Sequence, residues 1–455
     1  MQELKKLNTS LNEEILRMDR LFDQLFPICR SITGPGLRET LEILSEYIPL
    51  EHFSLASGTQ AFDWKIPQEW IIRNAILKGP DGEVIADFME HNLHVINYSE
   101  PIDNELELEE LQHHLFSIPS LPEAIPYVTS YYKKRWGFCI PHKKREELKP
   151  GKYHALIDSE FVDGGINFSH AVLPGKSDKE ILISSYVCHP SLANNELSGP
   201  ISSTFLYERL AEKPRRFTYR FVFVPETIGS ISYLYKFGDD LRQKLHAGLV
   251  LTCLGGNESL SYKKSRRGNS PTDLMWEHLV QYKEIHGDTR SFTPVNGSDE
   301  RQYCSPGFNL PVGQMSRTVY ATYPGYHNSL DTKEFMTIES LHESVNELEK
   351  LIEALEWDGY YVNTSPYGEV KLDKHGLYPD INAPGKTGLF SSNDLNDQRV
   401  QLSRILTILN YSDGQHTLRE IANQCECSIL QIIPIMELLL SKSIVTGPFE
   451  DRQEL

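Results

Sequence analysis

The sequence lacks the cysteine pairs that would hold a structural zinc ion. Its seven cysteines are scattered and odd in number, and no two of them are spaced as Cys-x-x-Cys. The two that stand nearest each other, Cys425 and Cys427, are too close for a usual zinc site. A scattered, odd set is typical of reduced thiols, so we expect no disulfides.

Long hydrophobic runs and an excess of positive charge are also missing. No apolar stretch approaches the roughly 18 residues that a membrane-spanning helix needs. The N-terminus from Met1 to Phe22 is helical in pattern and too polar for a signal peptide. The 45 lysines and arginines are outnumbered by 63 aspartates and glutamates, which gives a formal charge of −18. Such a chain repels phosphate backbones and anionic lipids, so we expect a cytoplasmic protein with no membrane or nucleic-acid partner.

The hydrophobic content of 40% is that of an ordinary globular protein, and the length predicts two or three domains. We expect residues 1–58 and 142–357 to form an α/β domain, because strand patterns alternate there with helical patterns. Residues 59–141 have short alternating segments with turn signals, which predict an inserted β-rich domain. Residues 358–396 are rich in Gly, Pro, Asn and Ser and predict a linker.

The last segment, residues 397–455, predicts a winged helix-turn-helix domain, since three helical patterns precede a short strand-like stretch. From Gln415 to Leu455 there are three basic residues against six acidic ones, and the expected recognition helix from Ser428 has almost no positive charge. This balance argues against DNA binding. We expect this domain to make a contact within the chain or with another subunit instead, so a homo-oligomer is one of the possible assemblies.

The stretch from Ile181 to Gly199 organises the α/β domain. It begins as a buried β-branched strand, breaks at the sequence CHP and passes through a polar turn into a helix that opens at Ser198. In open α/β sheets, ligands gather outside the carboxyl ends of the strands. His189 is therefore the first candidate site residue.

Further ionisable residues follow expected strand ends or lie in polar loops of this domain, namely Glu196, Glu226, Asp299 and His327. Histidines and carboxylates in such loops are the makeup of a metal hydrolase site, in which zinc lowers the pKa of bound water and a carboxylate takes its proton. A lone histidine is more often structural. Two histidines and a glutamate in matching loops make a metal site about as well supported as a purely structural role for these residues.

Five segments taken together resemble the zinc-dependent aminopeptidase fold: CHP, NNELSG, PETIGS, LTCLGG and YHNSLDT. More closely, the chain resembles a bacterial family of aminopeptidase-like domains with an inserted β domain and a C-terminal winged helix. The resemblance implies a mixed, largely parallel sheet flanked by helices. It also implies that His189 and His327 bind the metal and that Glu226 is the general base.

Three carboxylates of the resembled fold are absent from the matching positions. The bridging aspartate falls at Asn195, the second glutamate of the pair at Thr227 and the remaining aspartate near Thr252 or Cys253. Two dications without a bridging carboxylate would be poorly compensated. We therefore predict a single zinc ion.

The ligands predicted for this ion are His189, His327 and one carboxylate. Glu196 is the preferred carboxylate because it stands next to the lost aspartate, and Asp299 is the second choice. Tyr326, directly before His327, is a candidate to support an oxyanion.

Substrate recognition is less sharply indicated. Arg301 and Arg317 are candidates to bind a substrate carboxylate through two parallel hydrogen bonds, although single arginines are as well explained as solvated surface residues. We predict a metal-dependent hydrolase that acts on a small peptide or another amide substrate. The alternative is a non-enzymatic or regulatory protein whose degenerate site binds a ligand or partner. The resemblance also leaves open a hydrolase of cell-surface sugar metabolism, which no residue tests.

Overall fold

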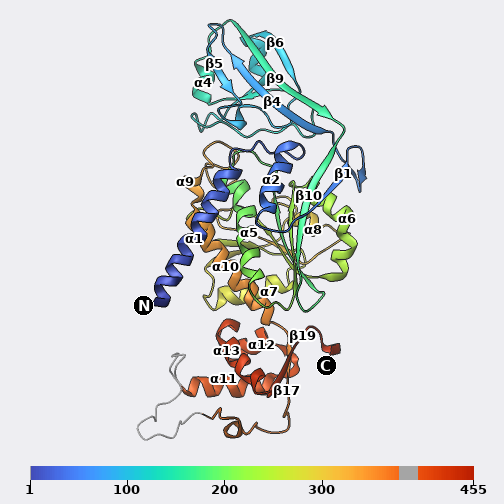
Figure 1. Cartoon of the computed structure of the whole chain (residues 1–455), viewed down its shortest axis with the longest axis vertical. Coiled ribbons are helices and arrows are strands. Elements are labelled where there is room, and N and C mark those ends of the chain that lie inside the picture. The colour runs from blue at the N-terminus through green and yellow to red at the C-terminus, as the bar shows by residue number, and fades with distance from the viewer. Residues whose placement is uncertain (1, 379–397, 455) are drawn as a thin grey trace. The chain divides into compact units, whose positions relative to one another are not determined.

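The structure, a computed structural model, describes residues 2–378 and 398–454 (Figure 1). These residues fall into two compact units. The first contains the chain up to Asp273 together with Gly287–Asn346, and the second contains Leu274–His286 and the chain from Glu347 onward.

The first unit is built on an eight-stranded sheet in the order β1-β10-β12-β11-β13-β16-β14-β15. The strands β12, β11, β13 and β16 run parallel to one another, while β1, β10 and β14 each pair antiparallel with a neighbour. Both β11 and β12 are buried along their whole length, as expected for parallel strands covered on both faces. The bounds are β1 Glu51–Ala56, β10 Gly165–Leu173, β11 Glu180–Tyr186, β12 Thr218–Val224, β13 Leu245–Leu251, β14 Leu260–Lys263, β15 Gly287–Arg290 and β16 Val312–Ser316.

Helices cover the two faces of this sheet, with α5 and α6 on opposite sides (Figure 1). The chain passes from β11 through α5 to β12, and from β12 through α6 to β13, so that β11 lies between the two strands that follow it. The strand order therefore reverses at β11, and the loop that carries His189 leaves the sheet at this switch point. The helices that lie wholly in the first unit are α1 Gln2–Leu25, α2 Pro35–Ser45, α5 Ser198–Ala211, α6 Ile228–Lys244, α8 Glu300–Tyr303 and α9 Lys333–Met336. The helices α7 Pro271–Gln281 and α10 Ile338–Trp357 each begin in the first unit and end in the second.

The inserted domain contains a four-stranded antiparallel sheet in the order β5-β4-β9-β6. Its strand β9 was expected to begin the second part of the α/β domain, after residue 141. Instead β9 pairs along its length with β4, so the insert extends to Val162. The bounds are β2 Gln60–Ala61, β3 Trp64–Lys65, β4 Glu69–Lys78, β5 Val84–Asp87, η1 Asn92–His94, β6 Ile102–Glu107, α3 Leu108–Leu111, η2 Gln112–His114, β7 Leu115–Phe116, β8 Phe138–Cys139, α4 His142–Glu146 and β9 Lys152–Val162.

The second unit contains the predicted helices and wing of a winged helix. A capping box formed by Thr417 and Glu420 starts α12, and Ser428 caps α13. The expected linker is partly structured: its strand β17 is the central strand of a sheet with β18 and β19, while residues 379–396 of that linker lie outside the described residues. The bounds are β17 Tyr360–Asn363, η4 Leu372–His375, α11 Gln398–Tyr411, β18 Asp413–Thr417, α12 Leu418–Gln424, α13 Ile429–Ser441, β19 Val445–Phe449 and η5 Arg452–Glu454.

Among the described residues, no single helix is both long and apolar enough to cross a membrane. The pair α12 and α13 meets that criterion of length and composition only when the two helices are taken together across a bend of 109°.

Candidate metal and active site

Four loops beyond the carboxyl ends of the parallel strands contain a non-glycine residue with a left-handed backbone. The φ angles are 48° at Ser191 after β11, 63° at Thr227 after β12, 53° at Cys253 after β13 and 56° at His327 after β16. Such conformations cost energy and tend to persist where the surrounding structure fixes them, often at functional sites. Three of these four loops carry candidate residues, namely His189, Glu226 and His327.

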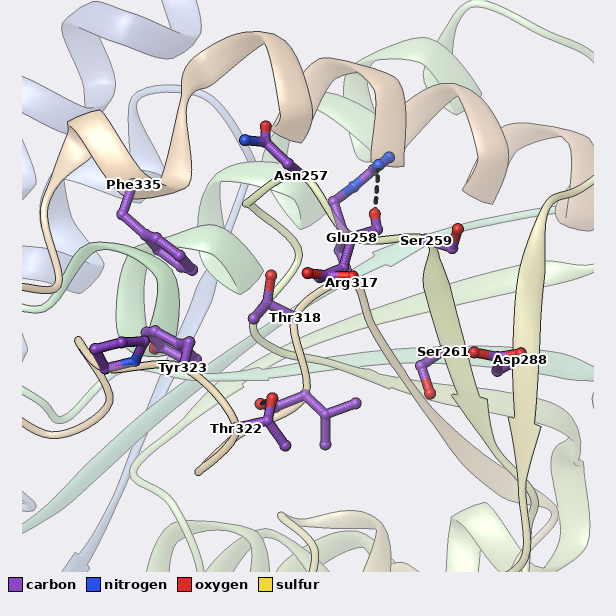
Figure 2. Close-up of a pocket in the computed structure, with 12 residues that line it drawn as sticks. Asn257, Glu258, Ser259, Ser261, Asp288, Arg317, Thr318, Thr322, Tyr323 and Phe335 are labelled. Carbon is purple, nitrogen blue, oxygen red and sulfur yellow. Dashed lines mark hydrogen bonds between the residues drawn. The ribbon is translucent and has the colours of Figure 1, made fainter.

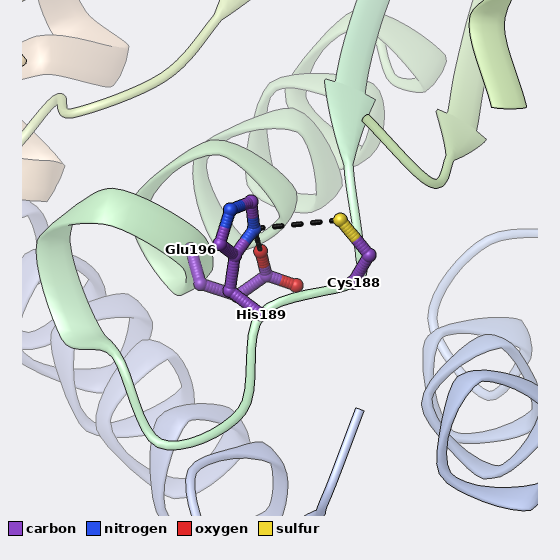
Figure 3. Close-up of side chains that lie close together, drawn as sticks. All are labelled: Cys188, His189 and Glu196. Atoms are coloured by element: carbon purple, nitrogen blue, oxygen red, sulfur yellow. Dashed lines mark hydrogen bonds and ion pairs between the residues drawn. The ribbon is translucent and has the colours of Figure 1, made fainter. Parts of the chain in front are cut away.

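His189 contacts three other side chains of these loops, two of which, Cys188 and Glu196, are drawn with it in Figure 3. Its Nδ1 lies 2.9 Å from Oε2 of Glu196 and 3.4 Å from Sγ of Cys188. Its Nε2 faces the other way, 3.7 Å from Oε2 of Glu226. The side chain is 5% exposed. The ring therefore has one nitrogen held by protein and one directed at a second carboxylate.

His327 lies beside this ring. The two imidazole centroids are 5.7 Å apart, and the phenol ring of Tyr326 stacks on His327 at 4.0 Å. Burial, and then the charge of His189, lower the pKa of His327 to about 3. A neutral imidazole is the form that binds a metal. No hydrogen bond to a ring nitrogen of His327 is present within the described part of the chain, which leaves its lone pair available.

The inserted domain supplies a wall of this site that the sequence did not indicate. The ring of Tyr127 lies 5.1 Å from that of His189 and 5.3 Å from that of His327, centroid to centroid. Its main-chain N–H donates to the carbonyl of His327 over 2.8 Å. Its hydroxyl is 2.7 Å from that of Tyr131. Only the tertiary contact between two distant segments brings Tyr127 here, so no sequence pattern could have found it.

Glu226 and Asp299 lie close together next to His189. The hydroxyl of Ser298 donates to Oε1 of Glu226 over 2.8 Å, which leaves Oε2 directed at His189. Asp299 is fully buried and accepts hydrogen bonds from the N–H of Thr227 at 2.7 Å and from a serine hydroxyl. Burial, and then the charge of Glu226, raise the pKa of Asp299 to about 8. Through these two hydrogen bonds Asp299 holds the start of the loop that carries Glu226 in place.

Asp331, in the YHNSLDT segment, was not among the predicted site residues. Its carboxylate oxygens accept the main-chain N–H groups of Asn194 at 2.8 Å and Asn195 at 2.9 Å, and the hydroxyl of Tyr323 at 3.2 Å. These bonds fix the π-helical turn Ala193–Leu197 that carries Glu196. The polar character of the segment indicated that it belongs to the site. The residue type alone could not show whether Asp331 binds a metal or holds the main chain in place.

The two arginines predicted to bind a substrate carboxylate also donate hydrogen bonds to protein groups. Arg301 is partly exposed, and its Nε donates to the carbonyl of Ser298 over 3.2 Å. The Nε of Arg317 donates to the hydroxyl of Ser344 and its Nη1 to the carbonyl of Glu258, both over 3.0 Å. Both guanidinium groups thus support loops near the site.

Arg317 also lines a pocket of about 610 Å³ (Figure 2). One wall is the loop from Arg317 to Pro324, which continues to His327, so the pocket and the metal-site candidates share a loop. Hydroxyl and carboxylate groups dominate the lining, and Phe335 stacks on Tyr323 at 4.7 Å. The remaining lining residues are Asn257, Glu258, Ser259, Ser261, Asp288, Thr318, Val319 and Thr322.

The donor atoms fit a single metal ion better than a pair. The two imidazoles are nitrogen donors of the kind that a mononuclear zinc site uses, and Glu226 lies beside His189 with a carboxylate oxygen free for proton transfer. Within the described residues, Oδ1 of Asn195 and Oδ2 of Asp299 are buried without a hydrogen-bond partner, as is seen near sites that take an ion or water. A second cluster exists, since ligand atoms of Cys188, His189 and Glu196 lie within 4.8 Å of one another. Burial raises the pKa of the Cys188 thiol to about 11, which disfavours the thiolate ligand.

Comparison with known proteins gives relatives over nearly the whole chain. A protein of Clostridium acetobutylicum named "Putative polysaccharide biosynthesis protein with aminopeptidase-like domain" is 38% identical over 422 residues, which is 93% of this chain and 94% of that protein. The crystal structure of a "putative peptidase" from Clostridium acetobutylicum superposes with a TM-score of 0.85 at 34% identity, covering 97% of this chain and 99% of the other.

The zinc aminopeptidase BSAP of Bacillus subtilis superposes with a TM-score of 0.53 at 11% identity, covering 74% of this chain and 94% of the other. That likeness shows the fold, and it confirms the predicted aminopeptidase-like fold class. Residues 359–447 match the winged helix-turn-helix family, which confirms the predicted C-terminal domain type. Residues 19–358 match the family described as "Domain of unknown function (DUF4910)", and the chain belongs to this family of aminopeptidase-like proteins.

Proposed function

We propose that this protein is a metal-dependent hydrolase that cleaves an amide bond, with one zinc ion and with Glu226 as the general base. The observation that carries the proposal is the position of His189. Its Nε2 is 3.7 Å from Oε2 of Glu226, and the neutral ring of His327 lies alongside. Two imidazoles and a carboxylate thus meet at the switch point of the sheet, where such folds bind their ligands.

A zinc ion held by His189 and His327 would supply a Lewis acid for the amide carbonyl and would lower the pKa of water. Glu226 is oriented by the hydroxyl of Ser298. Its free Oε2 accepts a proton from the attacking water and later returns it to the leaving nitrogen, which is the usual work of a general base. The hydroxyl of Tyr326 is the candidate donor to the developing oxyanion.

The adjoining pocket favours a polar substrate portion over an aliphatic side chain. An aliphatic group would dehydrate the hydroxyl of Ser259 and the carboxylate of Asp288 without giving them partners, which is costly. A hydroxylated group would satisfy them. The name of the Clostridium acetobutylicum relative concerns polysaccharide biosynthesis, so an amide attached to a sugar is the substrate we would screen beside short peptides.

The second candidate is a protein that keeps the fold and binds a ligand or partner without catalysis. It is favoured by the neutral residues Asn195, Thr227 and Cys253, which stand where the resembled aminopeptidases have carboxylates. These losses remove the charge that two metal ions need, but they leave the donors for one.

Metal content separates the two candidates. The measurement is plasma mass spectrometry on protein purified without a metal-binding tag. We expect about one zinc per chain in the wild type, none in His189→Ala or His327→Ala, and an unchanged content in the control His113→Ala, whose side chain is exposed in the insert. Glu226→Gln should keep the zinc and lose hydrolysis of any substrate found. A wild type that takes up no zinc even when it is supplied would favour the ligand-binding candidate.

A further inference from the structure

Arg30 and Glu196 form an ion pair beneath the candidate metal site. The Nε of Arg30 lies 3.3 Å from Oε1 of Glu196, and both side chains are 0% exposed. Removing two charges from water is costly, so a buried pair is weak evidence for stability alone. No local sequence pattern indicates this contact, because Arg30 comes from the segment between α1 and α2.

The same two residues hold both the ring and the main chain of His189. Oε2 of Glu196 accepts a hydrogen bond from Nδ1 of His189 over 2.9 Å. The Nε of Arg30 also donates to the carbonyl of His189 over 3.0 Å. Its Nη1 donates to the carbonyl of Leu25, which anchors the guanidinium to the end of α1. Rotation of the imidazole would break the bond to Glu196, and movement of the loop would break the bond to Arg30.

We infer that Arg30 and Glu196 are positioning residues for the metal ligand His189, and that Glu196 is not itself a ligand. The inference rests on the function proposed above. A carboxylate on Nδ1 holds a proton there, so Nε2, which faces Glu226, is the nitrogen left for the metal. Carboxylate–histidine pairs of this kind orient metal-binding rings and strengthen them as ligands. Arg30 holds the carboxylate in place and compensates its charge.

The charge of Arg30 also argues against the other arrangement, in which a metal ion lies among Cys188, His189 and Glu196. A dication bound to Glu196 would have the guanidinium as a close neighbour, since Arg30 is 3.3 Å from that carboxylate. Two positive charges on the same buried carboxylate repel each other strongly. The metal is therefore better placed on the Nε2 side of His189.

Zinc affinity, measured by competition with a chelator, tests this assignment. We expect Glu196→Ala and Arg30→Met to keep a stoichiometry of one zinc but to bind it about 10–100-fold more weakly, with Glu196→Gln in between because it retains an acceptor. Cys188→Ser should bind zinc like the wild type. The matched control is the buried pair of Arg220 and Glu180, 2.6 Å apart in the same sheet. Glu180→Gln should lower stability without changing zinc affinity.

Two results would overturn the assignment. Loss of zinc in both Glu196→Ala and Cys188→Ser would make these residues ligands, and unchanged affinity in Glu196→Ala and Arg30→Met would make the pair purely structural. Nitrogen-15 NMR of the metal-free protein, with labelled histidine, gives a readout that needs no zinc. At a pH high enough to leave the His189 ring neutral, a proton fixed on Nδ1 in the wild type, and no longer fixed there in Glu196→Ala, supports the positioning role even if the wild type binds no zinc and the proposed function fails. A proton that stays on Nδ1 in Glu196→Ala contradicts it.

Discussion

The side-chain amide of Asn195 donates a hydrogen bond to the hydroxyl oxygen of Tyr186 over 2.8 Å. The resemblance of the segment NNELSG to zinc aminopeptidases implies that Asn195 falls where those enzymes have a bridging aspartate. Its Oδ1 is buried and has no hydrogen-bond partner among the described residues. A neutral amide therefore stands where a bridge between two metal ions would need a carboxylate. Its N–H group donates to Tyr186, which an ionised carboxylate could not do.

Replacing Asn195 by aspartate should have opposite effects without and with metal. In the metal-free protein the change removes the donor to Tyr186 and adds a buried charge, so the free energy of unfolding should fall by about 1–3 kcal/mol. With zinc the new carboxylate stabilises the bound ion, so Asn195→Asp should show a larger zinc-induced rise in melting temperature than the wild type. Scanning calorimetry with and without zinc measures both effects.

Asn194→Asp is the matched control, because it makes the same chemical change at the next buried residue. The carbonyl oxygen of the Asn194 side chain already accepts the N–H of Gly255 over 2.8 Å, so this side chain is committed to the scaffold. A zinc-induced rise equal in the two variants would show that position 195 has no special relation to the metal.

The insert contributes a second prediction, through Tyr127. Its ring packs against the imidazoles of both His189 and His327. Tyr127→Ala would leave a cavity there, which typically lowers the free energy of unfolding by about 3–5 kcal/mol for a large aromatic side chain, and it would free both rings to turn. We expect zinc binding to weaken as well. Chelator competition and urea unfolding measure the two losses.

Tyr127→Phe separates the ring from the hydroxyl. This variant removes only the contact with the Tyr131 hydroxyl, so stability should fall by about 1–3 kcal/mol for the unpaired buried group, and zinc affinity should stay close to that of the wild type. Equal loss of zinc affinity in the Ala and Phe variants would contradict a role for the ring as a wall of the site.

The elements of the α/β core could be predicted from the sequence because their patterns are local. The strand from Ile181, the helix from Ser198 and the three C-terminal helices all have apolar periodicity and clear breaks at their ends. The sheet to which β9 belongs could not be predicted, since its alternating pattern fits either domain and only its pairing with β4 decides. The residues of the site could likewise be predicted only where a local sequence pattern indicated them. Residues after strand ends were found, while Arg30 and Tyr127 reach it through contacts between distant segments that leave no local pattern.

A third prediction concerns pH and the second unit. His278 in α7 accepts the N–H of Ile429 at Nε2 over 2.8 Å, and its Nδ1 lies 3.0 Å from Oδ1 of Asn423. These two bonds require the neutral ring with its proton on Nδ1. Burial lowers the pKa of His278 to about 4; the charge of Arg419 acts in the same direction, and the bond to Asn423 opposes it. The start of α13 therefore depends on an uncharged histidine.

Because the pKa is lowered by folding, the unfolded chain binds more protons than the folded one between pH 4 and an ordinary histidine value of about 6.5. The stabilisation is complete above about pH 6.5 and is lost as the pH falls toward 4, by about 3 kcal/mol in all. In His278→Gln the amide oxygen can still accept the N–H of Ile429 but cannot titrate. Urea unfolding of the second unit between pH 7.5 and pH 4.5 should therefore show a steeper loss of stability in the wild type than in His278→Gln. Parallel curves would mean that His278 is charged or exposed in the folded protein, and that the cap on α13 is not what the two hydrogen bonds indicate.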